Sequence, residues 1–127
     1  MEIILLANYF SVINVFNPCA VIPVYNHHQL INTVIEQLVR QQLPCIIIDD
    51  GSSSPCKEIL AKIAASDAKV SLLRFDSNRG KGAAVCAGLR AAVAKGFTHA
   101  LQVDADGQHN LDDAIKFINT SRQYPHT

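Results

Sequence analysis

The feature that most constrains the fold is a repeated alternation of short apolar runs with segments of helical spacing. The apolar runs are residues 19–24, 43–48, 70–75 and 98–103. The helical segments that follow them are residues 29–41, 55–66, 81–95 and 111–122. This order predicts the α/β class: a Rossmann-like open parallel sheet with helices on both faces and right-handed crossovers. Near-continuous apolar strands are typical of parallel sheets that are covered on both faces.

Composition excludes several classes of protein. The chain has 127 residues, enough for one core, and Lys+Arg and Asp+Glu both number 11, so it lacks the basic excess of a nucleic-acid-binding protein. No CxxC pair occurs, which argues against a zinc site. We interpret the cysteines as free buried thiols; they are Cys19, Cys45, Cys56 and Cys86.

The N-terminal segment, residues 1–17, is apolar but is interrupted by Asn and Ser. It lacks a basic region and a clear cleavage site, and it is shorter than the roughly 20 apolar residues that a membrane span needs. We predict an extension that packs on the domain formed by residues 18–127 or on a partner. A signal peptide or a membrane-surface segment is the alternative.

Polar residues follow each predicted strand, in the segments PVYN, DDGS, DSNRGKG and DADGQH. In open α/β sheets, ligands bind outside the carboxyl ends of the strands. If the strands are parallel, these four clusters meet at one edge of the sheet. The sequence therefore predicts a single binding site there.

Asp104 and Asp106 come at positions i and i+2 after the last apolar run. Two carboxylates on one side repel each other unless a hard cation such as Mg²⁺ or Mn²⁺ offsets them, with further oxygen ligands from a diphosphate. The alternative is a solvated Asp-x-Asp turn. His109 follows closely in the sequence, and we predict that it either binds the metal or contacts a phosphate.

The other clusters each allow two interpretations. Asp49 and Asp50 could accept hydrogen bonds from a nucleobase or form a strand-end turn. In NRGKGAA (78–84), the backbone N–H groups at a helix start suit an anion, with Arg79 and Lys81 nearby. That segment is neither a dinucleotide fingerprint nor a P-loop, and it could equally be a turn that lets the helix pack closely. Tyr25 could stack on a base or cover the sheet edge.

The motifs VIPVYN, IIIDDGSS, NRGKGAAVCAGLRAA and ALQVDADGQH, in this order, resemble family 2 glycosyltransferases of the GT-A fold. The subgroup they most resemble is the one of dolichol-phosphate-mannose synthases and related bacterial enzymes, over about residues 18–120. Only the N-terminal, donor-binding part of such an enzyme is matched.

The resemblance implies roles for individual residues. Asp49 matches an acid that binds the base, and Asp50 matches its partner acid. The metal ligands implied are Asp104, Asp106 and His109. The implied substrate-binding residues are Pro23, Tyr25, Asp49, Asp50, Arg79, Lys81 and Asp104.

The implied activity is metal-dependent, inverting transfer of a sugar from a UDP- or GDP-linked donor to an acceptor hydroxyl. The cofactor is Mg²⁺ or Mn²⁺, and the acceptor is unknown, with lipids and polymers both open. The alternative is a non-catalytic sugar-nucleotide-binding or assembly module. A phospho-acceptor receiver domain fits poorly, because no lysine ends a later strand.

In the family the catalytic base lies beyond the DxD motif, and this chain ends soon after its last predicted helix. We therefore expect a truncated form or a fragment that is inactive alone, with no catalytic base of its own; a stand-alone donor module is the alternative. Ending there would expose a strand edge, so we expect a homo-oligomer, with the apolar N-terminus as a candidate cover. The whole protein is expected in the cytoplasm, with peripheral membrane association left open.

Overall fold

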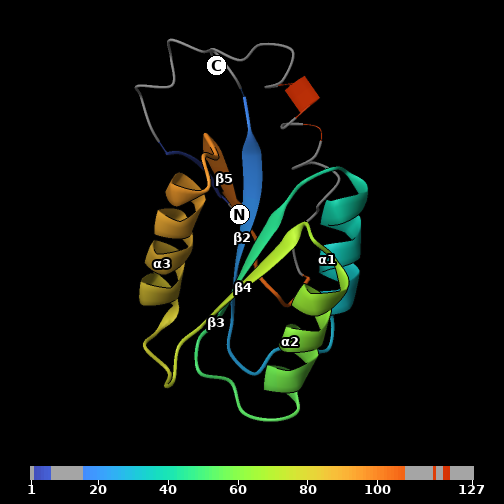
Figure 1. The fold of residues 1–127 in the computed structure, drawn as a ribbon, viewed down its shortest axis with the longest axis vertical. Coiled ribbons are helices and arrows are strands. Elements are labelled where there is room, and N and C mark those ends of the chain that lie inside the picture. The colour runs from blue at the N-terminus through green and yellow to red at the C-terminus, as the bar shows by residue number, and fades with distance from the viewer. Residues whose placement is uncertain (1, 7–15, 108–115, 117–118, 121–127) are drawn as a thin grey trace.

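The computed structural model describes residues 2–6, 16–107, 116, 119 and 120. Within these residues, one sheet of five strands has the order β1-β5-β2-β3-β4 (Figure 1). The strands are β1 (Glu2–Leu5), β2 (Pro18–Val24), β3 (Cys45–Asp49), β4 (Val70–Arg74) and β5 (His99–Gln102). Strands β2 to β5 are parallel, and β1 runs antiparallel to β5. The predicted α/β class with an open, mostly parallel sheet is confirmed.

The helices lie on both faces of the sheet, as Figure 1 shows. They are α1 (Ile31–Arg40), α2 (Cys56–Ser66) and α3 (Lys81–Ala94). From β2 through β3 to β4 the chain moves one way across the sheet, and after β4 it returns to the other side of β2. Crossovers of one hand must then place α3 on the face opposite to α1 and α2. This reversal beside β2 creates a switch point in the sheet.

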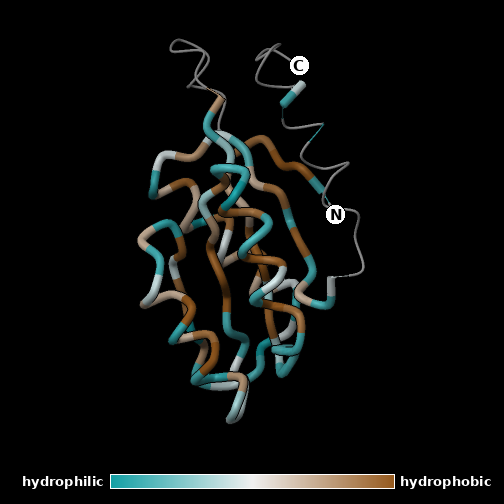
Figure 2. The backbone as a smooth tube through the Cα atoms, turned by 90° about the vertical axis from the view of Figure 1, so that its right-hand side faces the viewer, coloured by the Kyte–Doolittle hydropathy of each residue, from teal (hydrophilic) through white to brown (hydrophobic). Residues whose placement is uncertain are grey.

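The core has two parts because alternate residues of each strand point to opposite faces. On β2, Ala20, Ile22 and Val24 pack in the cluster that includes α1 and α2, whereas Cys19 and Val21 pack with α3. Strands β2 and β3 are therefore buried along almost their whole length, and hydrophobic stretches run through the interior of the molecule in Figure 2. This explains why the sequence shows apolar runs rather than strict alternation.

Helix α3 lies unusually close to the sheet at Gly88. A Cβ built on Gly88 would be 2.5 Å from Cγ1 of Val21 and 2.7 Å from Cδ1 of Ile48, both too close for real contacts. The buried residues of this helix are Ala84, Gly88 and Ala92, one every four positions. The small-residue face thus brings the N-terminal end of α3 near the carboxyl ends of the strands.

Residues near the N-terminus contribute a strand that the sequence did not predict. Strand β1 pairs with β5 from Glu2 opposite Gln102 to Leu5 opposite His99. The strand edge beside β5, expected to be exposed, is therefore paired within the chain. Among the described residues, no helix is long and apolar enough to cross a bilayer.

Two details differ from the sequence predictions. Helix α2, predicted from residue 55, begins at Cys56, and Pro55 is its N-cap. All the cysteines are free, as predicted, but Cys86 is exposed. The burial prediction was wrong for Cys86 because α3 has one solvent-facing side.

Most of the helix predicted at 111–122 lies outside the described residues.

Candidate functional site

A cavity of about 450 Å³ lies at the carboxyl ends of β2, β3 and β5 and beside the first turn of α3. Its lining residues are Pro23, Val24, Tyr25, His27, Asp50, Asn78, Gly80, Lys81, Asp104, Ala105 and Asp106. Strand β2 has β5 on one side and β3 on the other, so the cavity sits at the switch point of the sheet. This is the position where open α/β sheets bind ligands.

Polar clusters from all four predicted strand ends contribute to this cavity. The predicted site residues that line it are Pro23, Tyr25, Asp50, Lys81, Asp104 and Asp106. Asp49 and Arg79 do not line it, although each adjoins a residue that does. His109 lies outside the described residues.

Asp49 is fully buried and is engaged on both carboxylate oxygens. Its Oδ2 accepts a hydrogen bond from Nη1 of Arg74 at 2.6 Å, and its Oδ1 accepts one from the backbone N–H of Ser52 at 2.8 Å. Arg74 is the residue directly opposite Asp49 on β4. A buried carboxylate needs such compensation. In this arrangement Asp49 supports the strand end; direct contact with a base stays a prediction.

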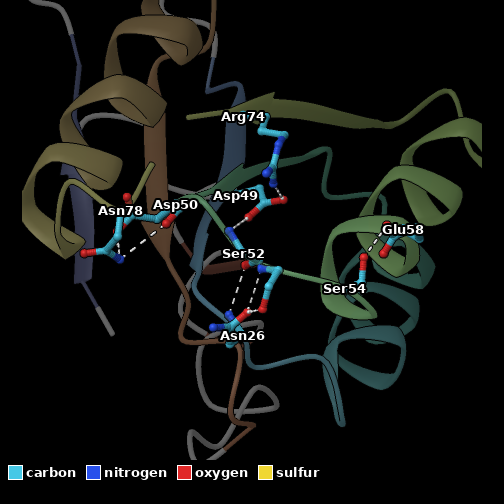
Figure 3. Close-up of polar contacts among 9 residues, drawn as sticks. Asn26, Asp49, Asp50, Ser52, Ser54, Glu58, Arg74 and Asn78 are labelled. Carbon is cyan, nitrogen blue, oxygen red and sulfur yellow. Dashed lines mark hydrogen bonds and ion pairs between the residues drawn. The ribbon is translucent and has the colours of Figure 1, made fainter. Parts of the chain in front are cut away.

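Asp50 points the opposite way from Asp49, toward Asn78 (Figure 3). Its Oδ1 accepts from the backbone N–H of Arg79 at 2.7 Å, and its Oδ2 accepts from Gly80 N–H and from Nδ2 of Asn78, both at 3.0 Å. The N–H groups of residues 79 and 80, expected to bind a ligand anion, therefore hold this side chain. Asp50 fixes the loop that leads into α3.

The guanidinium of Arg79 lies over the ring of Phe75, 4.4 Å from its centroid. Cation–π contact of this kind holds an exposed arginine against the surface of the protein. Arg79 itself does not line the cavity, and its backbone N–H donates to Asp50, which does.

The loops after β2 and β3 are joined by the side chain of Asn26. The Asn26 N–H donates to Oγ of Ser52, and the Asn26 Oδ1 accepts from the backbone N–H of Ser53, both at 2.9 Å (Figure 3). Gly51 has φ +77°, and an added Cβ would be 2.5 Å from the backbone N of Asn78. The loops after β2, β3 and β4 thus form one connected rim around the cavity.

Asp104 and Asp106 both line the cavity, and Nζ of Lys81 lies 2.8 Å from Oδ1 of Asp104. The described residues contain no group of three His, Cys, Asp or Glu side chains placed to hold a metal. Two carboxylates suit Mg²⁺ or Mn²⁺ when a substrate and water supply the other oxygens. The ammonium of Lys81 shows that this position attracts a cation, so the residues present fit such an ion.

Residues 19–127 match the sequence model of the family described as Glycosyl transferase family 2. The chain belongs to glycosyl transferase family 2. The match includes every residue that lines the described cavity. The resemblance seen in the sequence motifs is confirmed.

Two curated relatives in this family carry names that describe sugar transfer. A UDP-N-acetylglucosamine–dolichyl-phosphate N-acetylglucosaminyltransferase of Methanococcus voltae is 31% identical over 82% of this chain and 48% of its own length. A polyprenol monophosphomannose synthase of Mycolicibacterium smegmatis is 24% identical over 78% of this chain and 38% of its own length. The family 2 chain thus spans about half, or less, of these relatives.

A solved structure supports the GT-A fold. The mannosyltransferase PcManGT from Pyrobaculum calidifontis, in complex with GDP-Man and Mn²⁺, superposes with a TM-score of 0.58 at 22% identity. The alignment covers 71% of this chain and 27% of that structure. At this identity the likeness shows the fold of the family 2 domain.

Sequence reasoning missed three supporting residues of this family 2 site: Arg74, Asn78 and Ser52. Arg74 ends a strand at the same level as Asp49, so an opposite charge at two neighbouring strand ends was the available signal. Asn78 was noticed only as part of a glycine-rich segment. Its contact with Asp50 joins residues 28 positions apart, which no local pattern reveals.

Proposed function

We propose that this chain is the donor-binding part of a metal-dependent glycosyltransferase that binds a nucleoside-diphosphate sugar. The observation that carries this proposal is the convergence of four strand-end clusters on one cavity at the switch point, in a chain of family 2. The cavity of about 450 Å³ is in the range that small-molecule sites occupy.

The nucleoside end of the donor is assigned to the rim after β2. Tyr25 is 47% exposed beside the cavity and offers a ring for stacking on a base, with Pro23 as an apolar floor. Asp49 and Asp50 hold the neighbouring loops in place for this contact. Binding energy from such remote groups can then serve the chemical step.

The diphosphate end is assigned to Asp104, Asp106 and Lys81, which line the cavity together. Asp104 and Asp106 would hold Mg²⁺ or Mn²⁺, which supplies Lewis-acid stabilisation of the negative charge on the leaving nucleoside diphosphate. Lys81 adds a positive charge on the same side. The GDP-Man and Mn²⁺ of the solved mannosyltransferase support this class of donor and ion.

For the whole protein we propose a polyprenyl-phosphate acceptor, in place of the hydroxyl expected from the sequence. The names of the two curated relatives specify dolichyl phosphate and polyprenol phosphate products or acceptors. A phosphate monoester has its second pKa near 6, so its oxygen is already anionic at neutral pH. Such an acceptor needs no base. In one displacement its phosphate oxygen would bond to the anomeric carbon as the bond from that carbon to the diphosphate breaks, so that the nucleoside diphosphate leaves and the anomeric configuration is inverted.

The test is calorimetry of the protein with UDP-, GDP- and dTDP-sugars, in Mn²⁺ and in chelator. We expect one donor to bind in Mn²⁺ and to bind at least tenfold more weakly in chelator, because cation and diphosphate share the site. Asp104→Asn should weaken binding in Mn²⁺ to the level seen in chelator. Glu36→Gln is the matched control, since Glu36 is exposed on α1 and does not line the cavity.

Absence of binding by every donor would contradict the proposal, as would equal binding in Mn²⁺ and in chelator. Transfer to a polyprenyl phosphate is then measured with radiolabelled donor and the full-length protein. Donor binding without any sugar transfer to lipid or polymer acceptors would favour the binding-module alternative.

A further inference from the structure

Lys81 is the feature of the cavity that the proposed function does not fully explain. It is the first residue of α3, and its Nζ reaches Oδ1 of Asp104 at 2.8 Å, across 23 residues of sequence. Both side chains line the cavity. The lysine ammonium therefore sits against a carboxylate that the proposed function gives to a divalent cation.

The stability of α3 does not account for this lysine. The N-terminus of a helix carries partial positive charge and disfavours cations. The first turn of α3 has no acidic residue and no side-chain cap. Asp50 provides the favourable negative charge there by accepting from the N–H groups of Arg79 and Gly80. The positive charge of Lys81 is unfavourable beside the positive end of the helix dipole. The ion pair with Asp104 offsets this repulsion.

The ion pair between Lys81 and Asp104 can open by movement of the Lys81 side chain alone. The Lys81 side chain is 59% exposed and the Asp104 side chain 29% exposed, so water competes for both charges. The lysine head is a point charge on a flexible four-carbon stem. The segment just before Lys81 is held by three hydrogen bonds that Asp50 accepts from residues 78–80. Release of Lys81 from Asp104 therefore leaves the rim intact.

We propose that Lys81 is an exchangeable counter-ion: it neutralises Asp104 in the empty site and turns to the diphosphate when donor and divalent cation bind. This proposal rests on the proposed function. Without a diphosphate, a divalent cation and Lys81 compete for the same carboxylate. With a diphosphate, Lys81 gains new anionic oxygens and releases Asp104. Nucleotide and cation should therefore bind with positive coupling, and each should bind poorly alone.

The test is Mn²⁺ binding, measured by electron paramagnetic resonance of free Mn²⁺, without nucleotide and with saturating UDP or GDP. For the unmodified chain we expect weak Mn²⁺ binding alone and tighter binding with one of the nucleotides. Lys81→Met should tighten Mn²⁺ binding without nucleotide by roughly three- to tenfold, because one like charge near the ion is removed. It should also reduce the factor by which nucleotide strengthens Mn²⁺ binding.

Three further variants make the test decisive. Lys81→Gln also removes the charge and should tighten Mn²⁺ binding without nucleotide, which covers the case in which the methionine variant fails to fold. Lys81→Arg keeps the charge and should retain weak Mn²⁺ binding without nucleotide. Lys57→Met removes an exposed lysine of α2 outside the cavity and should change nothing. Mn²⁺ affinities of Lys81→Met and of Lys81→Gln equal to that of the unmodified chain would overturn the counter-ion role.

Failure of this inference differs from failure of the proposed function. If UDP or GDP binds in an Mn²⁺-dependent way but Lys81→Met leaves Mn²⁺ affinity unchanged, the donor assignment stands and the counter-ion role is wrong. If UDP, GDP and dTDP all fail to bind, the coupling is absent and both are wrong.

Discussion

Asp49 and Arg74 lie directly opposite each other at the ends of neighbouring parallel strands, and their side chains form an ion pair at 2.6 Å. The side chain of Asp49 is 1% exposed and that of Arg74 is 29% exposed. Arg74 therefore remains in contact with water, whereas Asp49 depends on its two protein donors. The pair ties β4 to the strand end that carries the DDGS loop.

Removal of Arg74 should leave a buried charge without its main partner. We expect Arg74→Met to lower the free energy of unfolding by about 3 kcal/mol, the usual cost of breaking a buried pair from one side. Urea unfolding followed by circular dichroism measures this change. Lys57→Met, which removes an exposed lysine, should stay within about 0.5 kcal/mol of the unmodified chain.

A double variant separates the lost pair from lost packing. Asp49→Asn in the Arg74→Met background removes the uncompensated charge and should recover part of the lost stability. If the double variant is less stable than Arg74→Met by the full cost of Asp49→Asn alone, the two side chains do not interact energetically.

At Gly51 the loop after β3 lies against the backbone of the loop after β4. Gly51→Ala would combine a positive φ of +77° with a Cβ 2.5 Å from the backbone of Ser77 and of Asn78. Gly96→Ala has a similar φ of +86° but open space around the new methyl group. Left-handed strain alone costs about 1–2 kcal/mol, so that is the loss expected at Gly96.

At Gly51 the backbone clash should add about 1–3 kcal/mol to that strain and displace the loop that Asp50 holds. Nucleotide binding should therefore weaken in Gly51→Ala and stay unchanged in Gly96→Ala, as measured by calorimetry. Equal losses of stability in the two variants would show that the close approach of the loops is unimportant.

These examples show which parts of the molecule the sequence could predict. The order of the parallel strands and helices could be predicted from the sequence. Burial on both faces gives such strands continuous apolar runs, which are easy to recognise. Convergence of the strand-end clusters then follows from parallel geometry. The opposite roles of Asp49 and Asp50 were not readable, because they depend on Arg74 and Asn78, each 25 or more positions away. Strand β1 was missed because four residues give too little pattern, and its pairing is set by β5.

The glycines of α3 provide a matched pair for the packing of this helix on the sheet. Gly82 has nothing within 4 Å of an added Cβ, so Gly82→Ala should stabilise the chain by up to about 1 kcal/mol through helix propensity. Gly88→Ala has the same propensity gain but collides with Val21 and Ile48. Overpacking of this kind costs about 1–3 kcal/mol, so its net effect should be destabilising. Thermal unfolding of both variants checks the opposite signs; stabilisation by Gly88→Ala would contradict the close packing of α3.

His99 should make stability depend on pH. It lies on β5 with its ring 4.7 Å from that of Phe16 and its Nδ1 2.9 Å from Oγ1 of Thr98, and burial lowers its pKa below the ordinary value of 6.5. The folded chain thus binds a proton at His99 less readily than the unfolded chain does. The free energy of unfolding therefore rises with pH over the range in which the unfolded chain is more fully protonated at His99 than the folded chain. The contribution of neutral His99 is fully present above about pH 6.5 and is lost as pH falls through the lowered pKa. Urea unfolding between pH 4.5 and 8 should show this loss in the unmodified chain and a smaller one in His99→Gln. Equal slopes in both would mean that His99 titrates alike in the folded and unfolded states.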